Sequence, residues 1–362
     1  MSVGKPLAIA VVLLLVVGGL SHRYIEQVWR APVVASAGEQ VYQVVPGMTT
    51  RQMLHDMQRA GYWTSVESVL IGQRLFMSDF VLKVGEYRLP ATASPEQLFT
   101  QFDTGQSLQR KLAFIEGEHA RQWQHRLATT FAGPDTDPQI AGQWLRASLS
   151  KEAIELMQAA GLAEPAVEGW FFPDTYYYDQ HTEPTDILLR AHQKMLAVLE
   201  QEWQARAAGL PYRFPYEALI MASLIEKETG VVAERAQIAG VFVRRLQRNM
   251  RLQTDPTVIY GLGEHYDGNL RRSDLRTDNP YNTYRRGGLP PTPIAMPGAG
   301  AIHAALNPAA GEALYFVARG DGTHQFSKTL EEHRAAVRQY QILNRRSDYR
   351  SAPPVTSGAG KG

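Results

Sequence analysis

The segment that most constrains this fold is residues 218–225, ALIMASLI, in which seven of eight side chains are apolar. Pro215 suits the first turn of a helix, and Gly230 suits its C-terminal end. At about 100° per residue, the apolar side chains of such a helix point in every direction. A helix that is apolar all round is buried. The sequence therefore predicts a helix at the centre of a domain.

The apolar run continues directly into three charged residues, Glu226, Lys227 and Glu228. Glu226 lies one turn beyond Ala222, so we expect its carboxyl to lose solvation and its pKa to rise, as a general acid requires near neutral pH. Lys227 and Glu228 are expected to point elsewhere as the helix emerges. The alternative is structural: Glu226 would pair with Lys227 or a nearby arginine, because ion pairs also perturb pKa values.

The composition narrows the classes of function. The chain has 362 residues, enough for two domains with real cores, and it carries 37 Lys and Arg against 36 Asp and Glu. Because it lacks a basic stripe with interleaved aromatics, we expect no nucleic-acid partner. The absence of cysteine excludes disulfides and thiolate metal sites. The ten histidines, among them His303, His324 and His333, show no ligand spacing such as H-E-x-x-H, so we expect no metal and no cofactor.

The N-terminus carries a run of fourteen uncharged residues, Leu7–Leu20, preceded by Lys5. The run is short for a membrane span, which needs about 20 residues, although Ser21 and a snorkelling Arg23 extend it. A cleaved signal peptide is the alternative, but the nearest small-residue cleavage site, at residues 35–37, lies too far from the run. We therefore expect an uncleaved single anchor and flank over residues 1–30, with the remainder exported.

We expect an α+β protein in which a small α/β subdomain precedes a larger, mainly helical domain. Composition and turn residues indicate a linker at 31–40, the subdomain at 41–106, the larger domain at 107–345 and a disordered tail at 346–362. The elements expected in the subdomain are strands at 41–45 and 86–89, and helices at 49–61, at 66–76 and from Ser94.

The larger domain begins with a predicted strand at 111–115 and a helix from Ala120. A long amphipathic helix follows at 186–208, and its predicted buried side carries Leu188, Leu189, Met195, Leu196 and Leu199. Residues 251–300 are rich in Pro, Gly, Asn, Asp and Tyr, which predicts functional loops. A buried strand at 314–318 and a closing helix at 333–343 complete the domain.

Three segments place amides, hydroxyls and carboxylates beside aromatic rings: EGWFFPDTY at 168–176, LQTDPTVIYG at 252–261 and PYNTYRRGGLPPTPIAMPG at 280–298. Sugars bind to this mixture, because flat rings stack on apolar sugar faces while polar groups meet the hydroxyls. Each segment alone is better explained by core aromatics and by prolines that shape loops. Together, around a helix that carries a glutamate, they indicate a saccharide site.

In their order, these segments resemble the endolytic murein transglycosylases, the YceG-like family. The resemblance rests on EGWFFPDTY, ASLIEKET (222–229), QTDPTVIY (253–260), PYNTY (280–284), GLPPTPI (288–294) and a late motif, YFV followed by DGTHQFS (315–327). It covers about residues 5–343 and includes the layout, in which a membrane helix precedes a LysM-like unit and a catalytic domain.

The resemblance implies a bacterial inner-membrane enzyme with a periplasmic catalytic domain. Such an enzyme would cleave the β-1,4 bond between N-acetylmuramic acid (MurNAc) and N-acetylglucosamine (GlcNAc) inside peptidoglycan strands, and it would terminate or trim nascent strands. The products would have 1,6-anhydro ends, and the family's catalytic glutamate falls on Glu226. One carboxyl suffices, because the attacking C6 hydroxyl is tethered to the reacting ring. Membrane peptidoglycan synthases are the implied partners.

Substrate contacts are expected around Glu226. The candidates are Ser223, Gln253, Asp255, Asn282, Tyr284 and Glu168. Ser223 lies one turn before Glu226, so its hydroxyl would bond the glutamate, the substrate or its own helix backbone.

Two other functions remain open. A hydrolytic muramidase would use Glu226 as the acid and Asp255 or Glu168 as the base, and its products would carry an added water. A non-catalytic peptidoglycan-binding scaffold would use the LysM-like unit and a degenerate cleft. The intact EKET segment argues against the scaffold.

Overall fold

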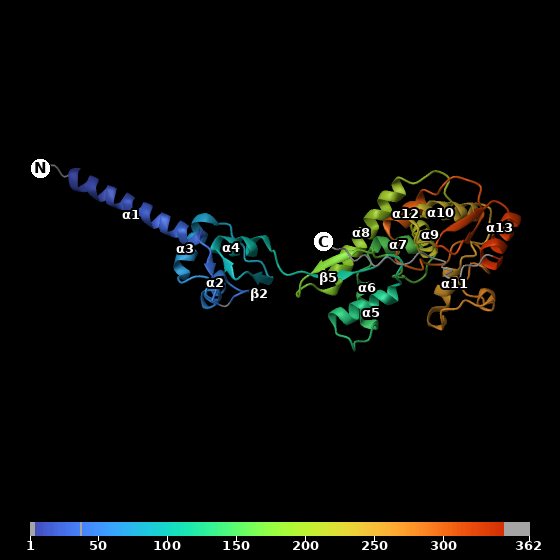
Figure 1. Ribbon diagram of the computed structural model, residues 1–362, viewed down its shortest axis with the longest axis horizontal. Helices are drawn as coiled ribbons and strands as arrows, with labels where there is room; N and C mark the ends of the chain where they lie inside the picture. Colours follow the sequence, from blue (N-terminus) through green and yellow to red (C-terminus); the bar gives the residue numbers. More distant parts are fainter. Residues whose placement is uncertain (1–3, 37, 344–362) are drawn as a thin grey trace. The chain divides into compact units, whose positions relative to one another are not determined.

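Figure 1 shows the computed structural model of the chain, which describes residues 4–36 and 38–343. The tail predicted at 346–362 lies outside the described residues. Helices predominate, and the described strands form four two-stranded sheets, so the expected α+β class is confirmed. The chain forms two compact units: unit 1 comprises residues 1–112 and 177–182, and unit 2 comprises residues 113–176 and 183–362.

Unit 1 contains the N-terminal helix and a small mixed fold. Its elements are α1 (Gly4–Arg30), β1 (Val33–Val34), β2 (Gln40–Val44), α2 (Thr50–Arg59), α3 (Val66–Phe76), β3 (Gly85–Leu89), β4 (Thr92–Ala93) and α4 (Pro95–Thr104). β1 pairs with β4 and β2 pairs with β3, both in antiparallel register. As predicted, Ser94 caps α4 and Pro95 occupies its first turn.

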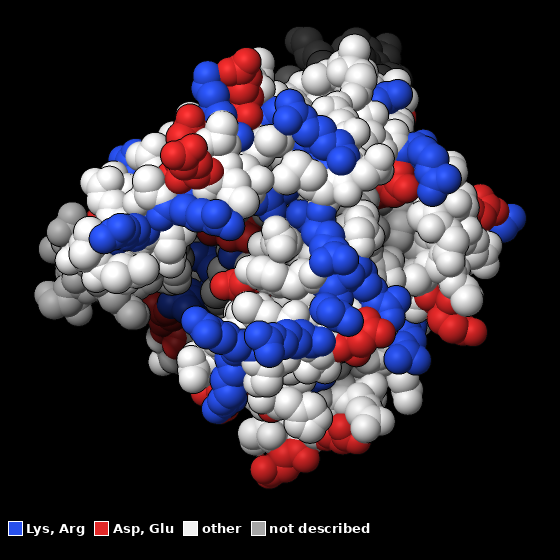
Figure 2. Space-filling view, turned by 90° about the vertical axis from the view of Figure 1, so that its right-hand side faces the viewer, with Lys and Arg blue, Asp and Glu red and all other residues white. Residues whose placement is uncertain are grey.

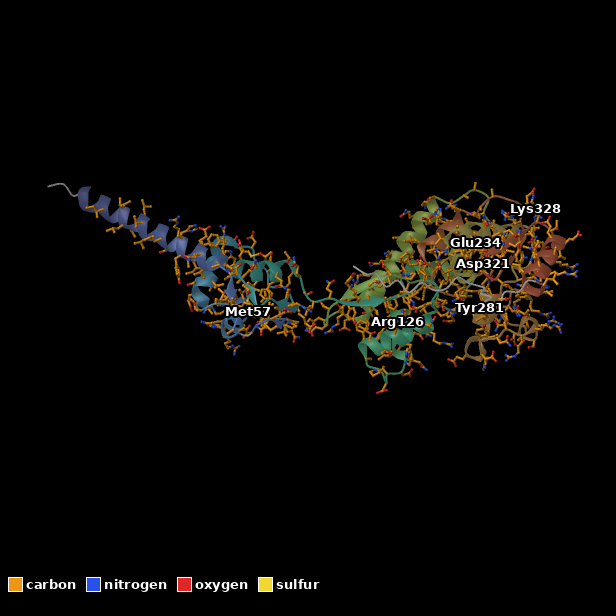
Figure 3. All side chains as sticks on the ribbon, viewed as in Figure 1. Met57, Arg126, Glu234, Tyr281, Asp321 and Lys328 are labelled. Carbon is orange, nitrogen blue, oxygen red and sulfur yellow. The ribbon has the colours of Figure 1, made fainter. Side chains whose placement is uncertain are left out.

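The core of unit 1 includes a side chain from α1 as well as those of the expected subdomain. Its fully buried large side chains include Trp29, Met53, Met57, Tyr87, Phe99 and Phe102; Met57 is labelled in Figure 3. Trp29 belongs to α1, so the C-terminal part of that helix is packed into the unit. Residues 31–40, expected to be an irregular linker, contain β1 and the buried Ala35, because their apolar side chains complete the same core.

Among the described helices, α1 is the one that is long and apolar enough to cross a membrane, over Val11–Arg30. Its large hydrophobic side chains from Val11 to Val17, and Leu20, are exposed. A soluble domain rarely exposes so large a contiguous apolar surface. The helix is therefore compatible with a single-pass membrane anchor.

The remaining elements build unit 2 and the strands beside it. β5 (Arg110–Ala113) and β6 (Thr175–Tyr178) form a two-stranded sheet. The helices and the last hairpin are α5 (Ala120–Phe131), α6 (Gln139–Ala147), α7 (Lys151–Ala159), α8 (Pro184–Gln204), α9 (Pro215–Glu228), α10 (Val232–Gln247), α11 (Asp255–Leu262), α12 (Ala299–Leu306), β7 (Tyr315–Ala318), β8 (His324–Ser327) and α13 (Leu330–Val337). Short 3-10 turns occupy Gly263–His265 and Asp274–Arg276, and a π-helical turn at Arg338–Leu343 follows α13.

The predicted buried helix is α9, and it forms the centre of unit 2. Every side chain from Ala218 to Ile225 is buried, and α8, α10, α11 and α12 pack around the helix. Tyr216 on α9 stacks on Trp170 with ring centroids 5.5 Å apart, which fixes the EGWFF segment against the helix. This packing surrounds the charged end of α9 with segments that are distant in sequence.

Two local predictions are wrong. On α8, Leu196 is half-buried and Leu189 is 41% exposed. Leu189 points outward because it lies about 100° round the helix from the buried Leu188. Residues 251–300 are not all loops, since Asp255 begins α11 and Ala299 begins α12. The proline that follows Asp255 sits in the first turn of α11, a position that proline favours.

Candidate active site

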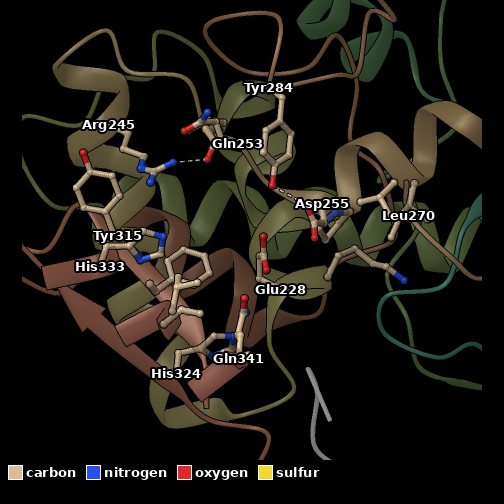
Figure 4. A pocket seen from close by; sticks show the side chains of 18 of the residues that line it. Glu228, Arg245, Gln253, Asp255, Leu270, Tyr284, Tyr315, His324, His333 and Gln341 are labelled. Carbon is tan, nitrogen blue, oxygen red and sulfur yellow. Dashed lines mark hydrogen bonds between the residues drawn. The ribbon is translucent and has the colours of Figure 1, made fainter. Parts of the chain in front are cut away.

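A cavity of about 670 Å³ lies at the C-terminal end of α9. Its lining comes from that end of the helix, from residues 252–284, from the β7–β8 hairpin and from residues 330–341. Figure 4 shows this lining, with Glu228 projecting toward the middle of the view. Of the charged residues that end α9, Lys227 and Glu228 line the cavity and Glu226 does not.

Glu226, which the sequence favours as the catalytic residue, is held by protein partners outside this cavity. Its side chain is 6% exposed, and its Oε1 accepts a hydrogen bond from Arg235 at 3.0 Å. Its Oε2 accepts a hydrogen bond from the backbone N–H of Gly298 at 3.0 Å. Burial raises the pKa of Glu226, while Arg235 and the Gly298 bond lower it. The expected loss of solvation and the expected rise in pKa are both present, together with the arginine ion pair of the structural alternative.

Glu228 is a buried carboxyl with a raised pKa, as the sequence predicted for Glu226. The Thr254 hydroxyl donates a hydrogen bond to Glu228 Oε1. Burial raises the pKa of Glu228 to about 7; the Thr254 bond and Arg245 oppose the rise, and the Asp255 charge adds to it. As expected, Glu228 points elsewhere than Glu226, and the start of α11 packs over the end of α9 where it lies. A carboxyl with this pKa is protonated in a large fraction of molecules at neutral pH.

One wall of the cavity contains Gln253, Asp255 and Tyr284, three of the residues predicted to contact sugar. The Tyr284 hydroxyl donates a hydrogen bond to Asp255 Oδ1 at 2.6 Å, as Figure 4 shows. Gln253 has a φ of 51°, in the left-handed region that favours glycine. Its backbone N–H donates to the Thr283 carbonyl at 3.3 Å, which ties the start of α11 to the PYNTY segment. A non-glycine residue holds such a φ only where its surroundings fix it.

The β7–β8 hairpin contributes His324, whose ring is oriented by a carboxylate. His324 Nδ1 lies 2.7 Å from Oε2 of Glu234, and the His324 backbone N–H donates to the other oxygen of Glu234 at 2.9 Å. Glu234, labelled in Figure 3, lies in the first turn of α10. A carboxylate on one ring nitrogen fixes the orientation of an imidazole and leaves the other nitrogen for a ligand. The DGTHQFS motif thus supplies a preorganised polar group to the cavity.

Two predicted sugar contacts hold the protein together instead. Ser223 is fully buried; its hydroxyl donates to the Ile220 carbonyl at 2.7 Å and accepts from the Ile294 N–H at 2.9 Å. Asn282 is also buried, and its side-chain amide donates to three carbonyls between residues 274 and 277, at 2.7–3.2 Å. Both side chains are closed off and bonded to backbone groups, so neither faces the cavity in this structure.

Glu168, the third predicted contact outside the cavity lining, caps a helix. Its Oε1 accepts from the Ala120 N–H at 2.9 Å, and its Oε2 accepts from the Tyr260 hydroxyl at 3.1 Å. Burial raises its pKa to about 7, against the lowering effect of those two hydrogen bonds. Because the side chain is buried at the start of α5, it is not placed to act as a base in the Glu228 cavity.

Sequence reasoning missed Glu228 and the Glu234–His324 pair. The EKET segment contains a second glutamate, and DGTHQFS contains a histidine. Neither motif indicates which of its side chains line the same cavity. Within residues 4–36 and 38–343, no group of three or more His, Asp or Glu side chains is arranged to hold a metal ion. The polar groups that line the cavity, Glu228, Asp255, Tyr284 and His324, are of the types that can support acid–base chemistry.

The chain is similar in sequence to a known protein family and to two named enzymes. The chain matches the YceG-like family over residues 42–339. It is 40% identical over 178 residues to an endolytic murein transglycosylase of Bacillus subtilis, which covers 48% of each chain. It is 31% identical over 182 residues to one of Streptococcus pneumoniae, covering 48% of this chain and 32% of the relative. These matches thus span about half of one relative's length and a third of the other's.

A solved structure extends the likeness over more of the chain. The crystal structure of a YceG-like protein from Listeria monocytogenes, at 2.6 Å resolution, is 28% identical in sequence. It superposes with a TM-score of 0.53, covering 83% of this chain and 99% of that chain.

Proposed function

Because the chain belongs to the YceG-like family, we propose that it is an endolytic murein transglycosylase. It would cleave the MurNAc-β-1,4-GlcNAc bond inside peptidoglycan strands, leave 1,6-anhydro-MurNAc ends, and so terminate or trim nascent strands. The names of the two relatives support this activity. The observation that carries the proposal is the position of Glu228, a carboxyl with a pKa of about 7 that lines the cavity at the end of the central helix.

In this mechanism Glu228 is the general acid and then the general base, and Glu226, on which the family's catalytic glutamate falls, is the alternative that the experiment below tests. Protonated Glu228 gives its proton to the glycosidic oxygen as the bond from that oxygen to C1 of MurNAc breaks. The resulting carboxylate takes the proton from the C6 hydroxyl of the same MurNAc ring, and O6 closes onto C1. Thr254 holds one carboxyl oxygen of Glu228, so the other oxygen is available for both transfers. The tethered hydroxyl replaces a positioned water.

A hydrolytic muramidase remains the second candidate, because Asp255 shares the cavity with Glu228. Hydrolysis by inversion needs a second carboxylate that activates water. Asp255 Oδ1 already accepts the Tyr284 hydroxyl at 2.6 Å, which favours a role for this pair in fixing Glu228 and binding sugar. Gln253, Asp255 and Tyr284 are therefore retained as the proposed substrate contacts, and Ser223, Asn282 and Glu168 are not.

The proposed substrate is a polymer, so protein surfaces outside the cavity would also contact it. On the face of the protein in Figure 2, Lys and Arg side chains gather in bands with acidic side chains between them. The peptide stems of peptidoglycan carry carboxylates, which such bands attract. Unit 1, read as a LysM-like module over residues 41–106, would also bind glycan. A purely binding scaffold would share these surfaces but would not need a carboxyl of raised pKa in the cavity.

The proposed location is the bacterial inner membrane, with α1 as a single-pass anchor and both units in the periplasm. The exposed apolar side chains of α1 support the anchor. An anchored strand-cutting enzyme acts where strands are polymerised, so the proposal includes association with membrane peptidoglycan synthases.

The test is mass spectrometry of glycan products released by the full-length chain in detergent micelles. Wild type is compared with Glu228→Gln and with the matched variant Glu226→Gln, which removes the same charge two residues away. We expect 1,6-anhydro ends from wild type and a loss of about 10²–10⁴-fold in rate for Glu228→Gln, the usual contribution of a positioned acid–base group. Glu226→Gln is expected to keep forming anhydro ends.

The other outcomes would overturn parts of the proposal. Loss of activity in Glu226→Gln alone would return the catalytic role to Glu226. Products that carry an added water would identify a hydrolase, and Asp255→Asn would then test the second carboxylate. Binding to peptidoglycan without cleavage by a folded wild-type protein would favour the scaffold.

A further inference from the structure

The surface of α3 that faces away from the core of unit 1 is partly apolar. Val66 and Val69 of α3 are buried in that core. Ile71 and Leu75, four residues apart on the helix, are 46% and 55% exposed. Residues at this spacing lie on the same helix face. Two large aliphatic side chains are therefore presented together to the surroundings.

This face of α3 continues the exposed apolar surface of α1. Leu20, Tyr24 and Ile25 of α1 line one groove together with Ile71 and Leu75 of α3. Leu20 and Tyr24 are 63% and 58% exposed. The apolar surface of the candidate membrane span thus continues onto the folded unit, through a groove that Ser21 and His22 also line.

Packing fixes how α3 lies against α1. A Cβ on Gly72 would come within 2.8 Å of the Trp29 ring, so glycine is what allows the two helices to approach here. The Phe76 ring at the end of α3 lies 5.7 Å from the His22 ring and 6.2 Å from the Trp29 ring. The C-terminal end of α3 therefore lies beside the part of α1 that directly follows its apolar run.

The length of the apolar run explains why this junction matters. Leu7–Leu20 has fourteen residues, which span about 21 Å as a helix, against about 30 Å for the hydrocarbon core of a bilayer. A short span draws its flanking residues toward the lipid or thins the bilayer locally. The next turns of α1 contain Tyr24, and α3 lies alongside them. Burial of Ile71 and Leu75 would offset part of the mismatch.

We propose that Ile71 and Leu75 of α3, with Leu20 and Tyr24 of α1, form a membrane-contact surface seated at the boundary between lipid headgroups and acyl chains. The occupant is the bilayer into which α1 inserts, so this inference rests on the proposed anchoring. Arg23 and Arg74 are exposed next to these residues, and their long stems reach the phosphates of the headgroups. Unit 1 is thereby held at the membrane surface by two helices.

The experiment exploits the absence of cysteine from the chain. Single cysteines are introduced into the full-length protein by Leu75→Cys, Leu15→Cys and Val41→Cys, and each is labelled with an environment-sensitive nitrobenzoxadiazole fluorophore. Leu15, on the apolar run, is 70% exposed, and Val41, on β2 away from the groove, is 58% exposed. The proteins are reconstituted into phosphatidylethanolamine–phosphatidylglycerol vesicles with and without lipids that carry a nitroxide quencher on the acyl chain.

We expect the quencher to remove about half or more of the emission at positions 15 and 75 and less than about a tenth at position 41, since only a probe within the span or on an interfacial helix reaches the acyl chains. Quenching at 15 but not at 75 would overturn the inference and leave the anchor intact. No quenching at either position would mean that the anchor itself fails. A probe at 75 that is shielded from aqueous iodide but not quenched by lipid would show that a second copy of the chain covers α3, which also overturns the inference.

Discussion

The proposed acid–base residue should weaken the folded protein at neutral and alkaline pH. Glu228 has a pKa of about 7 when folded, against an ordinary value of 4.5. Because the folded pKa is raised, stability associated with this carboxyl is fully present below pH 4.5 and is lost as the pH rises through about 7. The full loss is about 3 kcal/mol, and most of it falls between pH 5 and pH 8. The Glu228→Gln variant has no proton to lose and escapes this cost.

We therefore expect the free energy of unfolding of Glu228→Gln to rise relative to that of wild type by about 2–3 kcal/mol as the pH is raised from 5 to 8. For a unit of this size the gap in Tm should widen by about 5–10 °C. Thermal unfolding of both proteins at several pH values measures it. Glu164→Gln, which neutralises an exposed carboxyl of unit 2, is the control and should show no such trend. A gap that stays constant from pH 5 to 8 would refute the assigned burial of Glu228 and with it the basis of its acid role.

Three further variants separate structural from substrate-binding roles. Ser223→Ala leaves the buried Ile294 N–H without its acceptor, so we expect about 1–3 kcal/mol of destabilisation in denaturant unfolding with KM unchanged; a raised KM with normal stability would restore Ser223 as a contact. Gln253→Gly relieves the positive φ and should leave Tm equal or higher while KM rises, whereas a large drop in Tm would contradict the strain argument. Glu234→Gln frees the His324 ring, so we expect it and His324→Gln to lower kcat/KM by similar factors and the double variant to lower it little further; additive losses would show that the two residues act separately.

The central helix could be predicted because the signal lies within one segment. From Ala218 to Ile225 the sequence is apolar on all sides, and a helix with that property has few alternatives to burial. The outward position of Leu189 could also have been predicted, because a residue that follows the buried Leu188 on a helix lies about 100° round from it. Predictions of this kind depend on neighbours in sequence, which are all visible at once.

The choice between Glu226 and Glu228 depends on contacts that are distant in sequence. The two side chains leave the helix about 200° apart, so one must lie on the opposite side from the other. Arg235 and the Gly298 N–H close the side of Glu226, while Thr254 and the cavity lie on the side of Glu228. Nothing within EKET itself indicates which side is closed.

The roles of polar residues in loops were also hard to predict, because those roles depend on contacts that are distant in sequence. Asn282 has the amide that a sugar site uses, but the same amide can satisfy three backbone carbonyls of a neighbouring loop. Buried backbone carbonyls need partners as much as substrates do. The sequence shows that such a side chain is present. Only the packing shows whether it bonds to backbone carbonyls or to substrate.

The residues that line the cavity are far apart in the sequence, so the cavity is complete only after the last of them has been synthesised. Its lining begins at Lys227 and ends at Gln341, so the final strands and the last helical turns of unit 2 close it. A chain that emerges from the ribosome or a translocation channel N-terminus first presents α9 well before those walls exist. The proposed cutting of glycan would thus be deferred until the whole lining has been made and folded, and a prematurely terminated chain would have the glutamates but no enclosed site.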